Sequence, residues 1–317
     1  MPGTSSVTVF APGSVGNIGP GLDILGLALD GPGDRVTAEL AARPGIEITD
    51  SGHPDLPTDP ERHAAGIAAA AVLAAAGAVG TGLVLRCRKE LPLAGGQGGS
   101  AASAVAGAVA ANLLLGSPLD ATALLRAALA SEERLAGRHA DNIAPILLGG
   151  IALVRSLDPI DVVSLPVPRR LRVVIAHPDQ RMATAVARAV LPTAVPRALA
   201  LHQAAQVAAM VAALASGDLA LLGRALDDRI AEPARAPHLP GFLAAKAAAL
   251  AAGALGASIS GAGPSAFALA DGDESAGVVA AAMAAAYRSE GVAAATRVAA
   301  IDERGARSMS TPHEEAG

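Results

Sequence analysis

A glycine-rich stretch that runs directly into an apolar helical pattern is the part of this sequence best suited to chemistry. Residues 95–100 read GGQGGS, and an Ala/Val/Leu run follows to about Leu115. Glycines leave the backbone bare, so several N–H groups can converge on one anion, and a helix that begins there adds free N–H groups and the positive end of its dipole. Ser100 and Ser103 add hydroxyls that can cap the helix, contact phosphate or bind a metal. The pattern predicts a phosphate-binding loop.

A second interpretation of this stretch stays open. No Lys-Ser or Lys-Thr pair follows the last glycine, so the stretch is not a Walker A loop. A glycine-rich turn that only caps a buried helix would have the same composition. The glycines alone favour neither interpretation.

Other polar side chains stand in loops and at the ends of predicted elements. Asn17 and Asp23 either form turns through local side-chain bonds, which is the more usual role, or are held over a ligand. Glu132 and Glu133 fall near the end of a predicted helix, where carboxylates oppose the dipole and at least one is expected at the surface. The turn at 137–142, GRHADN, gathers polar groups that would face the phosphate loop.

Arg235 lies in the run EPARAP, between prolines that cannot continue a helix. A stiff turn would hold its guanidinium in place, and a planar fork suits the binding of a carboxylate. The alternative is an arginine in solvent.

Composition limits the kind of protein this can be. The chain has 317 residues, enough for two domains or one large one, and 52% of them are hydrophobic but only 1% aromatic, so Ala, Val and Leu must fill the core. The net charge of −5 argues against a nucleic-acid binder, and the single Cys87, expected in the core, excludes a disulfide framework. The N-terminus lacks a signal pattern, and the Ala-rich apolar runs predict buried helices rather than membrane spans. We expect a cytoplasmic protein that binds no membrane.

Strands and helices to position these groups follow from the periodicity. Strands are predicted at 7–10, 35–40, 45–49, 82–89, 151–155, 171–176, 257–260, 265–270 and 294–300. Helices are predicted at 62–76, from the glycine loop to 116, at 120–136, 183–190, 196–215, 219–228, 240–252 and 275–290. Residues 156–170 carry three prolines and are predicted to be a domain boundary, and the tail from Asp302 is expected to fray.

Six segments together, in their order and spacing, resemble the homoserine kinases of the GHMP small-molecule kinase superfamily over residues 7–300. They read APGSVGNIGPGLDILGLAL, LPLAGGQGGSAASA, GRHADNIAPILLGG, RMATAVARAVLP, EPARAPHLPGF and ISGAGPSAFAL. The resemblance implies an α+β fold of two domains around one cleft. Residues 1–160 would form the ATP-binding domain and residues 161–317 a ferredoxin-like domain.

The resemblance also implies roles for individual residues. Glu132 matches the magnesium carboxylate, with Ser100 as a second ligand and Glu133 as the alternative, and Asn142 lies near the transferred phosphoryl group. Asp23 is the one general-base candidate, although it would equally serve to bind substrate. The ATP loop comprises Pro92, Leu93, Ala94, Gly95, Gly96, Gln97, Gly98, Gly99, Ser100, Ala101, Ala102 and Ser103. The residues expected at the amino-acid substrate are Asn17, Asp23, His139, Thr184, Arg188, Arg235 and Gly261.

The implied reaction is the phosphorylation of the L-homoserine hydroxyl by ATP with Mg²⁺, in threonine biosynthesis, by a homodimer. Three residues depart from the family pattern: Gln97 replaces a leucine, Gly99 replaces a serine, and His63 stands where an asparagine is common beside the adenine. The alternatives are another GHMP kinase, acting on a mevalonate-type or sugar substrate, and a non-catalytic nucleotide-binding relative. Arg188 and Arg235 favour an amino-acid carboxylate over a sugar.

Overall fold

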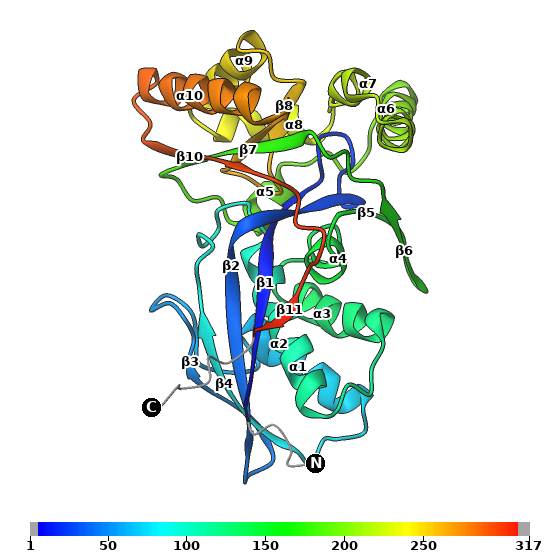
Figure 1. The fold of residues 1–317 in the computed structure, drawn as a ribbon, viewed down its shortest axis with the longest axis vertical. Helices are drawn as coiled ribbons and strands as arrows, with labels where there is room; N and C mark the ends of the chain where they lie inside the picture. The colour runs from blue at the N-terminus through cyan, green and yellow to red at the C-terminus, as the bar shows by residue number, and fades with distance from the viewer. Residues whose placement is uncertain (1–5, 310–317) are drawn as a thin grey trace, which may run out of the picture.

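A long antiparallel hairpin, β1 with β2, forms the centre of the first sheet in the computed structural model, which describes residues 6–309 (Figure 1). The described part of this sheet has seven strands, and β5 and β6 extend it from the end of β2. The strands are β11 (Arg307–Met309), β1 (Ser6–Gly16), β2 (Leu25–Ala41), β4 (Gly82–Arg88), β3 (Gly45–Asp50), β5 (Ile151–Leu157) and β6 (Ile160–Leu165).

The hairpin is longer than the sequence predicted. Only residues 7–10 were expected to be a strand, but β1 continues through its proline and glycines to Gly16, and residues 13–16 pair with residues 26–29. The register shifts between Pro12 and Gly13. Proline has no N–H to donate to the neighbouring strand, and such an irregularity is a place where a strand tolerates that loss. Pairing with β2 therefore outweighs the weak strand propensity of glycine and proline.

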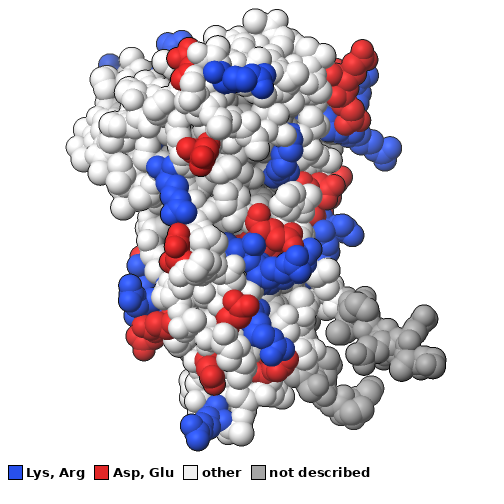
Figure 2. All heavy atoms as spheres, turned by 90° about the vertical axis from the view of Figure 1, so that its left-hand side faces the viewer, with Lys and Arg blue, Asp and Glu red and all other residues white. Residues whose placement is uncertain are grey.

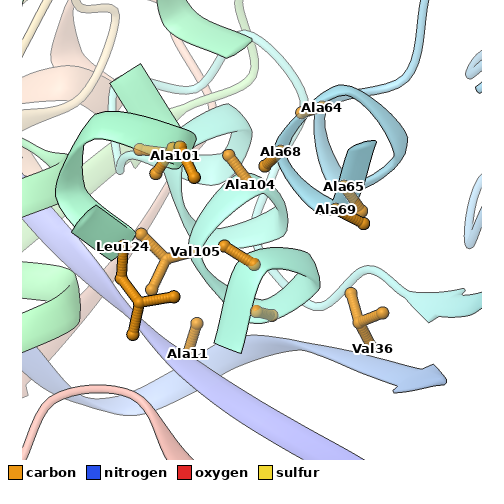
Figure 3. Packing of buried hydrophobic residues seen from close by; sticks show 14 of the residues in the cluster. Ala11, Val36, Ala64, Ala65, Ala68, Ala69, Ala101, Ala104, Val105 and Leu124 are labelled. Carbon is orange, nitrogen blue, oxygen red and sulfur yellow. The ribbon is translucent and has the colours of Figure 1, made fainter. Parts of the chain in front are cut away.

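Small side chains pack the helices of the first sheet closely. In Figure 3, Ala65, Ala68 and Ala104 lie between two helices, and Leu124 and Val105 fill the space toward Ala11 of β1. A side chain at Gly107 would approach the Ala65 carbonyl oxygen to 2.6 Å, so this contact needs glycine. The prediction that Ala, Val and Leu fill the core is confirmed. The helices are α1 (Ala64–Ala75), α2 (Gly99–Leu114), α3 (Ala121–Leu135) and α4 (Ile143–Leu148).

The second sheet is antiparallel, and within residues 6–309 it has four strands in the order β10-β7-β9-β8. This order, with helices between β7 and β8 and between β9 and β10, is that of a ferredoxin-like fold. The predicted α+β architecture with a ferredoxin-like second half is confirmed. Its elements are β7 (Leu171–Pro178), α5 (Thr184–Ala189), α6 (Arg197–Ser216), α7 (Leu219–Arg224), α8 (Ala231–Arg235), η1 (Ala236–His238), α9 (Phe242–Ala251), β8 (Gly256–Ile259), β9 (Ala266–Asp271), α10 (Asp273–Ser289) and β10 (Ala294–Ala299).

Apolar side chains join the two sheets. Val15 and Leu27 of the first sheet belong to the same buried cluster as Ile175 and Phe267 of the second, and α6 covers this cluster with Met210. The two halves consequently share part of their core. A cavity between them can be lined from both sides.

The structure adds detail to three connections. Part of residues 156–170 is strand, because β6 pairs with the end of β5 in a hairpin, and the domain boundary expected there stays a prediction. The strands at 35–40 and 45–49 are not neighbours, since β4 lies between β2 and β3. The expectation that the tail frays from Asp302 was wrong as far as Met309: Asp302 accepts from the Arg304 and Gly305 N–H groups, and β11 pairs with β1. The rest of the predicted fray, residues 310–317, lies outside the described residues.

Helix α6 differs from the other Ala-rich helices. Among the described helices it alone is long and apolar enough to cross a membrane by length and composition, and 22% of its most apolar stretch is buried. The expectation that every such run is a buried helix was therefore wrong for α6, because it packs through one narrow face that contains Gln203, Met210, Ala213 and Leu214.

On the face of the molecule drawn in Figure 2, basic and acidic side chains are interspersed.

Candidate active site

A cavity of about 340 Å³ lies where the two halves meet. The glycine loop and the end of α3 form one wall, and α5, Arg235 and residues 261–263 form the other. Most of the residues predicted for the ATP and substrate sites line it together. The two exceptions are Gln97 and Ala102: the side chain of Gln97 lines a groove behind the loop, and Ala102 is buried in the core.

The conformation of the loop explains its glycines. Gly96 and Gly98 both have φ near +70°, and Gly98 is the N-cap of α2. A Cβ at Gly98 would overlap the Ser14 hydroxyl, and a Cβ at Gly96 would overlap the carbonyl oxygen of Ser260. Glycine is required at both places for its backbone freedom and for the close approach of neighbours.

Four consecutive carbonyl groups of the loop are held by the rest of the protein. The Met182 N–H, the Ser265 hydroxyl, the Ser260 hydroxyl and the Ser14 N–H donate in turn to the carbonyl oxygens of residues 94, 95, 96 and 97. In a trans peptide the next N–H points opposite to the carbonyl, so the N–H groups of residues 95–98 are turned away from these donors.

No acceptor among the described residues takes the backbone N–H groups of residues 95–101. This run of free donors at the start of a helix, on the wall of a cavity, is what a phosphate chain requires. The geometry favours a phosphate-binding loop over a turn that only caps a helix.

A buried ion pair supports the loop from below, and the sequence analysis missed it. Lys89 pairs with Asp34 and also donates to the Gly99 carbonyl (2.8 Å) and the Ser103 hydroxyl (3.0 Å). Ser103 in turn donates to Asp34 (3.0 Å), so its hydroxyl is committed beneath the loop. The one available signal was a lysine at the end of a strand, just before the glycines.

Glu132 and Glu133 lie in different surroundings at the end of α3. Glu132 lines the cavity, and its Oε1 is buried with no hydrogen-bond partner among the described residues. Burial raises the pKa of Glu132, while His139 and the Ser100 hydroxyl beside it act in the opposite direction. Glu133 is exposed and pairs with Arg138 at 2.6 Å. The orphaned carboxylate oxygen next to a hydroxyl fits the oxygen ligands that Mg²⁺ prefers.

Further charged groups gather beside Glu132, with His139 Nε2 3.8 Å from its carboxylate. Arg188 donates to both oxygens of Asp23, at 2.7 and 3.2 Å. His139 Nδ1 lies 3.3 Å from the Asp141 carboxylate. Burial alone would lower the pKa of His139, but Asp141 and Glu132 outweigh it and the pKa is raised. Asp141, buried between these groups, was part of the polar turn noted in the sequence but was not singled out there.

Arg235 reaches the cavity from a short helix rather than from the stiff turn that was predicted. Pro233 falls in the first turn of α8, where the N–H that it lacks would have no helical partner. Arg235 is 3% exposed, and it donates to the carbonyls of Ala187 (3.1 Å) and Gly261 (3.0 Å). Burial lowers the pKa of its guanidinium. Thr184, at the start of α5, lies on the same wall.

Asn17 connects the two halves of the site. Its Nδ2 donates to the Gly261 carbonyl at 2.8 Å, and its Oδ1 accepts from the Asp23 N–H at 3.1 Å. The second contact is the local bond that a turn-forming residue makes. Asn17 also lines the cavity, so the role over a ligand stays a prediction beside it. Asn142 faces the loop, where its Oδ1 accepts from the Ser14 hydroxyl at 2.8 Å.

His63 caps α1 and lines the cavity. Its Nδ1 accepts from the Ala65 N–H at 3.2 Å, its Nε2 lies 3.3 Å from the Ser51 carbonyl, and burial lowers its pKa. Leu56, Pro57 and Arg62 line the cavity beside it.

Comparison with known proteins agrees with this architecture. Residues 63–150 match the family model for the GHMP kinases N terminal domain, and residues 210–289 match that for GHMP kinases C terminal. The chain is 41% identical to the homoserine kinase of Chlorobium phaeovibrioides over 85% of this chain and 88% of that protein. It is 44% identical to the homoserine kinase of Arabidopsis thaliana over 85% of this chain and 75% of that protein.

A solved structure gives the same result. The crystal structure of homoserine kinase from Cytophaga hutchinsonii superposes with a TM-score of 0.92 at 41% identity, covering 96% of this chain and 98% of the other. These matches span both halves of the chain. The chain belongs to the homoserine kinases of the GHMP kinase family.

Proposed function

We propose that this protein transfers the terminal phosphoryl group of ATP to the side-chain hydroxyl of L-homoserine, giving O-phospho-L-homoserine for threonine biosynthesis. Its family makes it an ATP-dependent kinase that acts on a hydroxyl group. One observation carries the proposal: a cradle of free N–H groups and a cluster of carboxylates and arginines line the same cavity.

The glycine loop holds the phosphates of ATP in this proposal. The free N–H groups of residues 95–101 and the dipole of α2 stabilise negative charge where the phosphoryl group is transferred, and Lys89 supports the loop from below. Glu132 and Ser100 would hold Mg²⁺, which when bound neutralises phosphate charge. Leu56, Pro57 and Arg62 would contact the nucleoside.

The charged end of the cavity binds the amino acid. Arg188 and Arg235 take its carboxylate, and Asp23 and Asp141 take its ammonium group. This needs Arg188 to give up one of its bonds to Asp23 in favour of the substrate. With the carboxylate and the ammonium group of the amino acid both held, its side-chain hydroxyl is placed beside Asn142 and the glycine loop.

A dedicated base is not required by this arrangement. Phosphoryl transfer depends mainly on positioning and charge stabilisation, and the hydroxyl proton can leave late. Both oxygens of Asp23 accept from Arg188, which favours a role in binding over proton abstraction.

The carboxylates decide between the candidate substrates. A mevalonate-type acid would satisfy the arginines but has no ammonium group for the buried Asp141, and a sugar would satisfy neither. A coupled ADP-release assay with L-homoserine, mevalonate and galactose tests this choice. We expect turnover with homoserine alone. Turnover with mevalonate or galactose instead would overturn the proposed substrate, and no turnover with any acceptor would favour the non-catalytic alternative.

The remaining expectations extend the proposal. The division into domains 1–160 and 161–317, the homodimer, and the place of the reaction in the cytoplasm stay predictions. Light scattering of the purified protein tests the homodimer, and a mass of about 62 kDa, twice the 31.0 kDa of the chain, is expected.

A further inference from the structure

We propose that Arg297 and Gln97, which bond to each other, and Ser265, which connects Gln97 to the loop backbone, form a clamp that positions the phosphate loop from behind, so that the second half of the chain sets the affinity for the nucleotide. We call Gln97, Ser265 and Arg297 the loop clamp. They are positioning residues, because neither Gln97 nor Arg297 lines the active-site cavity. This inference rests on one part of the proposed function, namely that the glycine loop binds ATP.

Gln97 turns its side chain away from the cavity. It is 5% exposed and borders a separate groove of about 450 Å³ between the back of the loop and β7 and β10. Its Oε1 accepts from the Arg297 guanidinium at 3.3 Å, and its Nε2 donates to the Ser265 hydroxyl at 3.3 Å. The residue that departs from the family leucine therefore uses both ends of its amide.

Arg297 has no carboxylate partner among the described ion pairs. From β10 it donates one nitrogen to Gln97 and another to the Asp30 carbonyl at 3.1 Å, on the β1–β2 hairpin. Burial lowers the pKa of Arg297, because its guanidinium is partly removed from water. Its two hydrogen-bond acceptors are neutral, so we assign its main effect to holding these two groups in position.

Ser265 completes the connection to the loop backbone. Its single hydroxyl proton goes to the Gly95 carbonyl at 2.6 Å, so its oxygen accepts from Gln97 and from His177 Nδ1 at 3.0 Å. His177 must then carry its proton on Nδ1, and burial lowers its pKa, in keeping with a neutral ring. In the chain Arg297–Gln97–Ser265–Gly95, each side chain thus donates a hydrogen bond to the next group.

The clamp acts on the part of the loop with the most backbone freedom. Gly95, Gly96 and Gly98 have no Cβ, and Gly96 and Gly98 have positive φ, so the peptide planes between them can rotate if they are not held. Fixing the Gly95 carbonyl and the Gln97 side chain fixes the direction of the N–H groups of residues 96 and 97. Loss of the clamp should weaken phosphate binding without touching the amino-acid end of the cavity.

Four variants test the clamp: Gln97→Leu, Arg297→Met, the double variant, and Gln180→Leu as the matched control. Gln180 borders the same groove but donates to the Pro240 carbonyl instead of the loop. Isothermal titration with a non-hydrolysable ATP analogue gives Kd without an acceptor, and steady-state kinetics give KM for ATP and for homoserine.

We expect each single variant to weaken nucleotide binding about three- to tenfold, the effect of one ordinary hydrogen bond, because the Arg297–Gln97 contact is long. The double variant should lose little more than either single variant, because both remove the same contact. KM for homoserine should stay within about twofold of wild type, and Arg297→Lys should restore part of the affinity lost in Arg297→Met. Gln180→Leu should bind as wild type does.

Wild-type affinity in Gln97→Leu, additive losses in the double variant, or an equal rise of both KM values with a lower Tm would overturn the clamp. Failure of the proposed function is a separate result. If wild type binds the ATP analogue but phosphorylates no homoserine, the substrate is wrong while the binding data still decide the clamp.

Discussion

At the scale of single residues, the cavity contains charges that are already paired with each other. Arg188 and Asp23 hold one another through two hydrogen bonds, and His139 and Asp141 lie together behind them. The first pair is half-buried and the second is buried, and in each the opposite charge offsets part of the cost of removing the group from water. An amino acid carries a carboxylate and an ammonium group. Its carboxylate can replace Asp23 as a partner of Arg188, and its ammonium group can replace Arg188 as a partner of Asp23.

Arg188→Met should lower kcat/KM for homoserine by about 30- to several-thousandfold, the equivalent of about 2–5 kcal/mol for a shielded Arg–carboxylate bond. Arg188 is the sharper choice than Arg235, whose guanidinium also supports the carbonyls of Ala187 and Gly261. Steady-state kinetics check the loss, and KM for ATP should change little. An amino alcohol without the carboxylate should be a poor substrate that loses far less on the same substitution. Equal losses for both acceptors would mean that Arg188 is structural.

Glu132→Gln should lower kcat and raise the concentration of Mg²⁺ needed for half-maximal rate by about ten- to a hundredfold, because a ligand oxygen loses its charge. Glu133→Gln is the matched control, since Glu133 is exposed and pairs with Arg138. Magnesium titrations of both variants measure the effect. A change confined to Glu133→Gln would place the metal ligand one residue further along the chain.

Cys87 should be inert to thiol reagents in the folded protein. It is 5% exposed in β4, and burial raises the pKa of its thiol to about 12, so almost no thiolate exists near pH 8. Labelling with a coloured disulfide reagent should proceed only after unfolding in denaturant. Rapid labelling of the native protein would show that β4 opens or that the thiol is accessible.

At the scale of elements, the glycine loop depends on particular glycines and not on glycine content. Gly98 combines a positive φ with contact to Ser14, whereas Gly99 begins α2 with helical geometry. The nearest atom to a Cβ at Gly99 is the Lys89 Nζ at 3.3 Å, a tight contact but not an overlap. The two adjacent glycines therefore differ in what they tolerate.

Gly98→Ala should cost about 1–2 kcal/mol for the left-handed backbone alone, and more because Ser14 must move away from Asn142. Nucleotide affinity should fall with it. Gly99→Ser, which restores the residue usual in the family, should fold with an unchanged Tm and bind ATP at least as well. Calorimetry and titration of an ATP analogue measure both. Normal affinity in a folded Gly98→Ala protein would contradict the geometry of the loop.

Local patterns predicted most of the elements but not their partners. The start of α3 near Asp120, the apolar strands of the second sheet and the helix after the glycines follow from short-range rules, and the structure has them all. The Lys89–Asp34 pair could not be predicted, because its members are 55 residues apart and meet only through the register of β2 and β4. The same holds for Gln97 and Arg297, 200 residues apart.

At the scale of the whole molecule, the site belongs to both halves of the chain. The loop and Glu132 come from the first half, Arg188 and Arg235 from the second, and the shared core around Val15 and Phe267 holds the two together. The strand β11 returns from the second half to pair with β1 (Figure 1). The resemblance in sequence indicated two domains around a cleft, but the carbonyl contacts that tie the loop to residues 260–265 follow from the structure alone.

The measurement that tests the central claim most directly is the position of the new phosphate. The arginines are proposed to hold the carboxylate, so that the hydroxyl alone meets the phosphoryl group. Phosphorus and proton NMR of the product from ATP and L-homoserine should show a phosphomonoester coupled to the side-chain CH₂ protons, in amounts equal to the ADP released. A mixed anhydride that hydroxylamine traps, or ADP release with inorganic phosphate as the one phosphorus product, would contradict the account.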